Sequence, residues 1–208
     1  MILFDYKNAI HPDSGKTYEV HKDIIITPFW TEEFCKQLVE ISEFYSTNFK
    51  NTIKWGGYDE IGAWKDLALN HISDITFLNY CRHYKRDIIP IMSEVFGKGV
   101  QTFGWFTPNI LRYNNPGDCI SSHYDVSWIT LNIKLNNDYQ GCDLVFPRQG
   151  FDAAEVPLGY AMVWPSLTTH PHHSTPLISG TKYAFSSWTW PPRWSPSDAG
   201  SIVNSDQL

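Results

Sequence analysis

The fold is decided by a stretch in the second half of the chain, SSHYDVSWITLNIKLNN at residues 121–137. Its first part places His123 and Asp125 two residues apart, and side chains with this spacing on an extended strand point to the same face. Its second part alternates apolar and polar residues from Ile129 to Leu135. Such alternation predicts a strand with one face in a core, Thr130 and Asn132 lying on the other face.

A second histidine from another strand would complete a set of metal ligands with His123 and Asp125, and His172 is the candidate. Two histidines and one carboxylate cap one face of a metal ion and leave the opposite face open, which is typical of non-haem Fe(II) oxygenases. An isolated His-x-Asp is weak evidence, because a surface turn explains it equally well. The flanking segments strengthen the metal interpretation: residues 111–117 resemble a strand that ends in a turn, and residues 141–146 and 159–165 resemble strands bounded by Gly or Pro.

The region from Arg112 to Pro191 resembles the iron- and 2-oxoglutarate-dependent dioxygenases, and within them the prolyl and lysyl hydroxylases. The greatest similarity is to the catalytic domain of the procollagen lysyl hydroxylases. A further segment, Gly57 to Asp66, looks like the region that precedes this core. The matching runs follow the order and spacing of the family, and they are Ser122–Asp125, Ile129–Asn136, Asp138–Gly141, Thr169–His172 and Pro176–Tyr183.

This resemblance implies a mainly β protein with flanking helices, a distorted double-stranded β-helix of the jelly-roll or cupin-like type. It also implies a catalytic site in which His123, Asp125 and His172 bind Fe(II), with 2-oxoglutarate and O2 as further reactants and ascorbate as a reductant. Lys182 matches the basic residue that pairs with the far carboxylate of 2-oxoglutarate. Tyr113 and Asn132 match the positions of further contacts with this cosubstrate.

Three histidines crowd together near the third ligand position. On an extended strand His170 and His172 share a face, and His173 points away. The family spacing to Pro176 and Lys182 favours His172 as the ligand. His170 is left as a supporting donor or a substrate-facing residue, and His173 is expected to be exposed to solvent.

The N-terminal half is expected to be scaffold. Residues 24–26 predict a strand, and a helix is expected from about Glu32 to Tyr45 with Thr31 as its N-cap. A second helix is expected to begin after Ser73 and to run towards Ile88, with Pro90 kinking or restarting it. The whole chain is interpreted as a single dioxygenase domain, with scaffold over residues 1–100, a metal-binding core over 101–194 and a mobile tail over 195–208.

Composition narrows the choice of partner. The net charge is −6, with 16 Lys and Arg against 22 Asp and Glu, which argues against a nucleic-acid partner. The sequence shows neither a signal peptide nor an apolar run long enough for a membrane helix, and its four cysteines lack a zinc-like spacing. These features favour a cytoplasmic protein without a membrane partner, of bacterial, phage or viral origin, whose buried helical Cys35 and Cys81 are free thiols.

The favoured function is hydroxylation of lysine side chains in peptide or protein substrates. Proline remains an alternative target, because lysyl hydroxylases usually carry Arg where this chain has Lys182, whereas several prolyl hydroxylases carry Lys. Hydroxylation of a free amino acid or another small metabolite is a second possibility, since the fold serves many substrates. A non-catalytic binding module is disfavoured, because all three ligands and Lys182 are present.

Overall fold

The computed structural model describes residues 5–48, 55, 65–98, 104–105, 108–190 and 203–204. Its helices are α1 (Glu32–Asn48), α2 (Leu69–Ile72) and α3 (Asp74–Val95). Its strands are β1 (Glu19–His21), β2 (Ile24–Pro28), β3 (Lys65–Ala68), β4 (Gly104–Trp105), β5 (Asn109–Tyr113), β6 (Ile129–Lys134), β7 (Tyr139–Gly141), β8 (Leu144–Phe146), β9 (Phe151–Asp152), β10 (Tyr160–Pro165), β11 (His173–Ser174), β12 (Leu177–Gly180), β13 (Lys182–Trp190) and β14 (Val203–Asn204).

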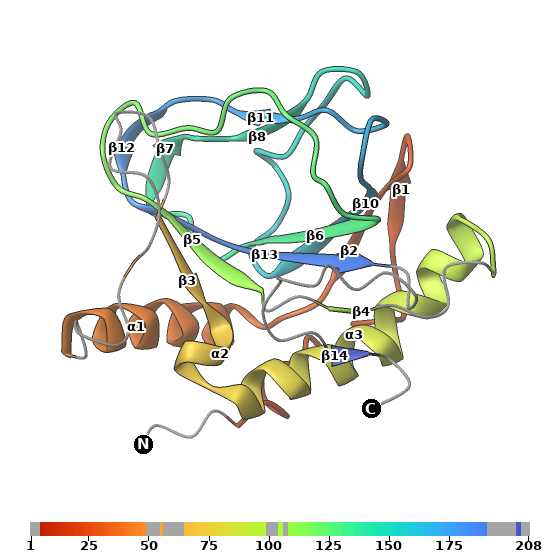
Figure 1. Cartoon of the computed structure of the whole chain (residues 1–208), viewed down its shortest axis with the longest axis horizontal. Coiled ribbons are helices and arrows are strands. Elements are labelled where there is room, and N and C mark those ends of the chain that lie inside the picture. The colour runs from red at the N-terminus through yellow and green to blue at the C-terminus, as the bar shows by residue number, and fades with distance from the viewer. Residues whose placement is uncertain are drawn as a thin grey trace.

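The strands form a large antiparallel sheet faced by smaller ones (Figure 1). The large sheet has the order β1-β2-β10-β6-β13-β4-β14, with β5 pairing β13 and β3 pairing β5. The smaller sheets, β11-β8-β9 and β12-β7, lie across from it on the side away from the helices. This is the expected mainly β jelly-roll with flanking helices, and its interior between the sheets is where a site can be enclosed.

The main core lies between the large sheet and the helices, as Figure 1 shows for α1, α2 and α3 beneath that sheet. Strand β6 shows how the sequence pattern builds it. Leu131 and Ile133 are fully buried in this core, whereas Thr130 and Asn132 face the space between the sheets. The alternation read from the sequence is therefore confirmed, with the apolar face on the helices and the polar face on the interior.

The two long helices begin where the sequence predicts. The Thr31 hydroxyl accepts a hydrogen bond from the Phe34 N–H (3.3 Å) at the start of α1, and the Ser73 hydroxyl accepts one from the Thr76 N–H (3.2 Å) at the start of α3. Of the two alternatives expected at Pro90, a kink or a restart, the restart is excluded, because α3 runs through this residue to Val95. Pro90 is exposed, so water can replace the backbone donor that it lacks.

Of two other expectations, one is corrected and one is confirmed. The segment 141–146 is not one strand: β7 ends at Gly141 and β8 begins at Leu144, because Cys142 between them adopts a left-handed conformation (φ 56°). Cys35 and Cys81 are buried free thiols, as expected.

Some expectations lie largely outside the described residues. Of the segment resembling the family upstream of the core, residues 57–64 are not described, and of the tail 195–208 only Val203–Asn204 is described, as β14 paired with β4. None of the described helices is long and apolar enough to cross a membrane.

Candidate metal centre and cosubstrate pocket

His123 and His172 lie side by side although they are far apart in the sequence. They form an isolated antiparallel bridge in which each backbone N–H donates to the other residue's carbonyl, at 2.9 and 2.8 Å. Asp125 follows two residues later and lies outside the named strands. The prediction that His123 and Asp125 share a regular strand is therefore wrong in detail. The two side chains nevertheless reach one place, with ligand atoms within 4.8 Å of each other.

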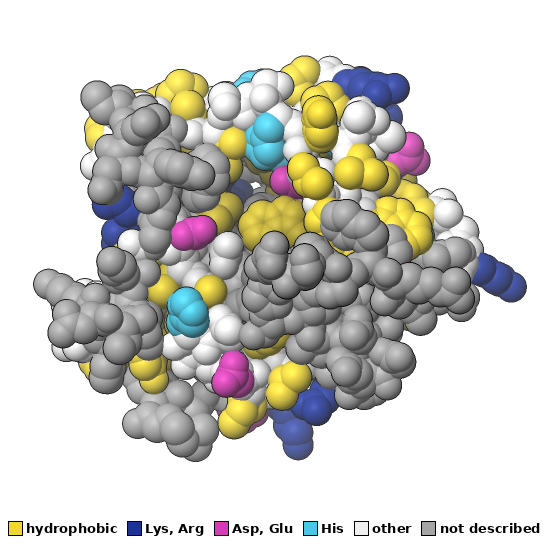
Figure 2. Space-filling view, in the orientation of Figure 1, with side chains coloured by type: hydrophobic (Ala, Val, Ile, Leu, Met, Phe, Trp, Pro, Cys, Tyr) yellow, Lys and Arg dark blue, Asp and Glu magenta, His cyan; other side chains and the backbone are white. Residues whose placement is uncertain are grey.

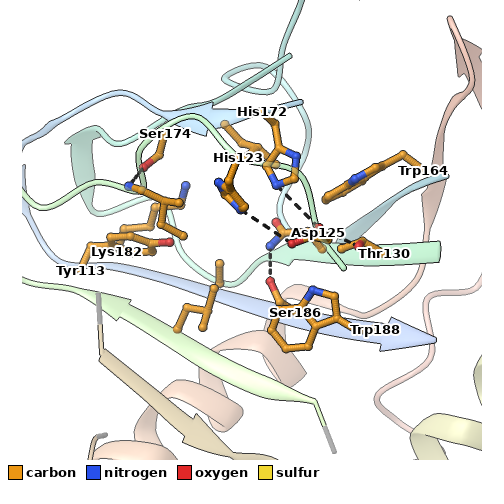
Figure 3. A pocket seen from close by; sticks show the side chains of 15 residues that line it. Tyr113, His123, Asp125, Thr130, Trp164, His172, Ser174, Lys182, Ser186 and Trp188 are labelled. Carbon is orange, nitrogen blue, oxygen red and sulfur yellow. Dashed lines mark hydrogen bonds and ion pairs between the residues drawn. The ribbon is translucent and has the colours of Figure 1, made fainter. Parts of the chain in front are cut away.

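The three side chains converge on one point (Figure 3). His123 Nε2 lies 3.7 Å from Asp125 Oδ1, and His172 Nε2 lies 3.7 Å from Asp125 Oδ2. All three ligand atoms are within 4.8 Å of one another. These separations are too long for direct hydrogen bonds, so the nitrogens and the carboxylate face a shared centre rather than pairing with one another.

The backbone fixes which nitrogen of each imidazole is free. His123 Nδ1 lies 2.8 Å from the Ser121 carbonyl, and His172 Nδ1 lies 2.9 Å from the His170 carbonyl. A carbonyl only accepts hydrogen bonds, so each Nδ1 carries the proton and donates. Each neutral ring then presents the Nε2 lone pair to the shared centre, which is the arrangement found in metal-binding histidines.

Asp125 is held by a group of hydroxyls. The Thr130 hydroxyl donates to Asp125 Oδ2 at 2.7 Å, and Thr130, Ser127 and Ser166 hydrogen-bond one another at 2.7–3.0 Å. Burial alone would raise the pKa of Asp125, but His123, His172 and Thr130 together lower it below its ordinary value. The carboxylate is therefore ionised at neutral pH, as a metal ligand must be.

The electrostatics of the two histidines differ. Contact with Asp125 raises the pKa of His123, which is partly exposed at the pocket. Burial lowers the pKa of His172, whose ring packs against Phe146 and Trp164 with centroids 5.2 Å away in each case. The second ligand is thus kept neutral by its apolar surroundings.

A pocket extends from these three residues between the sheets. In Figure 2 apolar side chains surround a hollow on this face, with histidine and acidic side chains at its edge. Strand β13 forms much of the floor, because alternate residues along it turn inward. Those residues, with their partners on neighbouring strands, are Trp188 beside Thr130, Ser186 beside Asn132, Ala184 beside Leu111 and Lys182 beside Tyr113.

Lys182 lies at the end of this floor away from Thr130 (Figure 3). Its side chain is 8% exposed, and its ammonium group donates to the Cys142 carbonyl and lies 5.7 and 5.6 Å from the ring centres of Tyr113 and Tyr139. Burial lowers its pKa. Among the residues that the structure describes, no carboxylate lies within ion-pair distance of it. A buried ammonium group without a carboxylate is costly, and an incoming anion would offset that cost.

Tyr113 and Asn132 both line the same pocket as the three ligands. Tyr113 is 4% exposed and lies opposite Lys182 in the β5–β13 register. The Asn132 amide donates to the Ser186 hydroxyl at 2.7 Å, which orients it midway along the floor. The structure therefore brings all six residues predicted from the sequence to one cavity.

The remaining histidines of the cluster have other positions. His170 is 2% exposed, and its ring turns to the Lys22 carbonyl and the Thr169 hydroxyl rather than to the pocket. His173 was expected to be exposed but is half-buried, because it begins β11 and pairs with Val145 of β8.

The three hydroxyl side chains near Asp125, those of Thr130, Ser127 and Ser166, were not predicted from the sequence. Thr130 had been placed on the same face as Asn132, which is a usable signal for a pocket residue. Ser127 and Ser166 carry no comparable pattern, because they meet only when β6 and β10 pair. The same holds for Ser186 and Trp188 on the floor of the pocket.

The donor set suits a divalent iron ion. Two imidazoles whose Nδ1 atoms are bound by backbone carbonyls, and one ionised carboxylate held by a hydroxyl, are the ligands expected for a non-haem Fe(II) site with open positions. No other group of three possible ligands of this kind is found among the described residues.

Comparisons with known proteins find relatives named as 2-oxoglutarate-dependent dioxygenases. No family model matches the chain. It is 30% identical over 189 residues to mouse procollagen-lysine,2-oxoglutarate 5-dioxygenase 1, a match that covers 86% of this chain and 25% of the relative. The chain thus spans about a quarter of the length of the curated relatives that it matches.

Solved structures share the fold. A Pseudomonas putida prolyl-4-hydroxylase superposes with a TM-score of 0.62 at 16% identity, covering 81% of this chain and 93% of that one. The viral collagen prolyl hydroxylase of Paramecium bursaria Chlorella virus-1 superposes with a TM-score of 0.56 at 13% identity, covering 80% and 94%. In sequence the chain is therefore similar to 2-oxoglutarate-dependent dioxygenases, and in fold it is similar to prolyl hydroxylases.

Proposed function

We propose that this chain is a 2-oxoglutarate- and Fe(II)-dependent oxygenase and that it hydroxylates lysine side chains in peptide or protein substrates. When bound, Fe(II) with 2-oxoglutarate and O2 supplies the oxidation that converts a substrate C–H to C–OH and releases succinate and CO2. His123, Asp125 and His172 are the residues that would hold the iron. Ascorbate would keep the iron reduced.

The observation that carries this proposal is the relation between Lys182 and the three ligands. One pocket has a metal-binding face at one place and, further along its floor, a buried ammonium group without a carboxylate partner among the described residues. A dicarboxylate that binds the metal at one end needs a cation for the other end. Lys182 supplies that charge, and Tyr113 and Asn132 line the pocket around the same ligand.

The chain's own residues would do three things in the reaction. Thr130 orients the Asp125 carboxylate, and the carbonyls of Ser121 and His170 orient the two imidazoles. Lys182 binds and positions the cosubstrate. The apolar walls, which include Leu111, Ala184 and Trp164, exclude water from the reacting atoms.

Lysine is favoured as the target because the sequence similarity is to procollagen lysyl hydroxylases. The net charge of −6 also favours a basic peptide over a polyanion. Proline is the second candidate, because Lys182 stands where lysyl hydroxylases usually have Arg.

Two measurements test the proposal. Anaerobic addition of 2-oxoglutarate to the Fe(II)-loaded protein should produce a weak visible charge-transfer band, and its absence would contradict the cosubstrate assignment. Exposure to air with ascorbate and a library of lysine- and proline-containing peptides, followed by fragmentation mass spectrometry, should then locate one added oxygen on lysine. Oxygen on proline would shift the assignment to the second candidate. Oxygen inserted only into a free amino acid, with all peptides unchanged, would reject a peptide substrate and leave the iron chemistry standing.

A further inference from the structure

His170 is buried next to the metal ligands, yet its ring does not enter their pocket. Its Nε2 lies 3.2 Å from the backbone carbonyl of Lys22, and its Nδ1 lies 3.0 Å from the Thr169 hydroxyl. Because a carbonyl only accepts, Nε2 carries a proton and donates to Lys22. His170 is only 2% exposed, and its ring N–H thus forms a hydrogen bond with a residue far away in the sequence.

The backbone of His170 faces the opposite way, towards the metal centre. Its carbonyl accepts the hydrogen bond from Nδ1 of His172 at 2.9 Å. This bond fixes both the tautomer and the ring plane of a proposed metal ligand. The position of the His170 carbonyl therefore determines where the lone pair of His172 points.

The partner of the His170 ring is a well-defined turn. Lys22 and Asp23 connect β1 to β2, and both have positive φ (46° and 69°), as the two-residue turns of β-hairpins require. This conformation is unfavourable for residues other than glycine, so the surrounding structure must hold it. Strand β2 pairs with β10, and His21 packs on Phe151 at a ring distance of 5.1 Å, which anchors the hairpin.

A second set of contacts holds the residues just before His170. The side chain of Gln149 donates to the Thr169 carbonyl at 3.1 Å, and that of Arg148 donates to the Thr168 carbonyl at 3.4 Å. These bonds restrain residues 168–169, just before His170. The His170 carbonyl accepts the hydrogen bond from His172. Among the contacts that the structure describes, only the hydrogen bond from the His170 ring links this residue to the β1–β2 turn.

We propose that His170 is a positioning residue: by binding the Lys22 carbonyl in the β1–β2 turn, it fixes the backbone carbonyl that orients the metal ligand His172. The N-terminal hairpin, which contributes no ligand, thereby contributes to metal affinity. This inference rests on the proposed metal site.

The test compares three variants with the unaltered protein, using Co(II) as the probe in place of Fe(II). His170→Phe keeps a ring of similar shape but removes the donor. His170→Gln keeps a side-chain N–H that can reach the Lys22 carbonyl. His173→Phe is the matched control. His173 also neighbours His172, but it lies in β11 and pairs with Val145 of β8. For each protein, Co(II) affinity, the Co(II) visible spectrum and the thermal unfolding midpoint without metal are measured.

We expect His170→Phe to bind Co(II) about tenfold more weakly with an altered spectrum, as is usual when a group supporting a metal ligand is lost. His170→Gln should recover most of the affinity, and His173→Phe should bind as the unaltered protein does. Equal Co(II) binding by all folded proteins would overturn the positioning role. So would an equal loss of affinity in the Phe and Gln variants, or failure of both to fold, because either result assigns His170 to packing alone.

If only the Phe variant fails to fold, the Gln variant decides: near-normal affinity supports the role, and lost affinity overturns it. Failure of the unaltered protein to bind Co(II) would instead remove the proposed metal site itself. The two failures are therefore distinguishable.

Discussion

The cluster of His123, Asp125 and His172 and the cluster of His83 and Asp87 both set an imidazole Nε2 against a carboxylate. The distances are 3.7 Å in the first and 3.1 Å in the second. In the second cluster the Ser14 hydroxyl lies 2.8 Å from His83 Nε2 and donates to Asp87 at 2.6 Å, and Arg86 binds Asp87 through two nitrogens at 2.5 Å.

The two clusters differ in the hydrogen-bond partners of their imidazole nitrogens. His83 also contacts the Tyr6 hydroxyl through Nδ1 (3.2 Å) and stacks on Phe29, so each of its nitrogens has a partner among neighbouring side chains. In the first cluster backbone carbonyls take the Nδ1 protons, and the Nε2 lone pairs remain directed at a common point. The same residue types thus build a closed structural network at α3 and a metal-binding geometry between the sheets.

The largest expected effect is a loss of metal binding that occurs in variants of the first cluster and not in those of the second. Asp125→Ala or His172→Ala should reduce Fe(II) or Co(II) binding by at least about 100-fold, because a ligand is lost outright. His83→Gln should leave metal binding unchanged and lower the unfolding midpoint. Metal titration and thermal unfolding of the same samples check both halves. If His172→Ala retained the anaerobic 2-oxoglutarate band while His170→Ala lost it, the ligand assignment would be wrong.

The cation near each cluster, Arg86 in one case and Lys182 in the other, should differ in its effect on ligand binding. Arg86 is already paired with Asp87, whereas Lys182 has no carboxylate partner among the described residues. Lys182→Ala should weaken 2-oxoglutarate binding by about 1.5–3 kcal/mol, or roughly 10- to 150-fold, with little change in metal affinity. Lys182→Arg should retain part of the affinity, and Asn132→Ala should show a milder loss. The measurement is the dependence of turnover on 2-oxoglutarate. An unchanged KM in a folded Lys182→Ala protein would exclude the proposed role.

A smaller effect is expected at the hydroxyl that holds the ligand carboxylate. Thr130→Val removes the bond to Asp125 while keeping the shape of the side chain, and should lower metal affinity by about 1 kcal/mol, roughly fivefold. Thr130→Ser keeps the hydroxyl and serves as the control. Co(II) titration of both variants decides the point, and equal affinity in the two would show that the hydroxyl does not support Asp125.

The smallest effect concerns acid stability, and it belongs to the structural cluster. Burial lowers the pKa of His83 despite the nearby Asp87. Burial would raise the pKa of Asp87, but Arg86, His83 and Ser14 hold it well below its ordinary value. Both groups bind protons more readily in the unfolded chain, so stability falls as pH drops, below about 6.5 for His83 and below about 3.9 for Asp87.

His83→Gln should therefore reduce the loss of stability between pH 7 and pH 5, because glutamine takes up no proton in this range. Denaturant unfolding of the metal-free protein at the two pH values measures it, with His173→Phe as the control. An identical pH dependence in His83→Gln and the unaltered protein would contradict the assigned direction of the His83 shift.

Much of the architecture follows from local sequence patterns. Apolar and polar residues alternate along β6, and Thr31 and Ser73 stand at the starts of α1 and α3. These features depend on backbone geometry over a few residues. The same local reasoning left a kink or a restart open at Pro90, where the helix continues, and it failed at Cys142, where a left-handed residue divides one expected strand into two.

From the sequence alone, His123, Asp125 and His172 were predicted as metal ligands and Lys182, Tyr113 and Asn132 as cosubstrate contacts, and the structure places all six in one pocket. Spacing and order along the chain are enough for this, since they depend on short-range backbone periodicity and on similarity to a family. The contacts that support these residues depend on the tertiary structure. The bond from Thr130 to Asp125, the lack of a carboxylate near Lys182 among the described residues and the contact of His170 with Lys22 all depend on strand register and on the packing of distant segments. A shift of one residue in any of these pairings would turn the same side chains to the other face, so no local pattern can specify them.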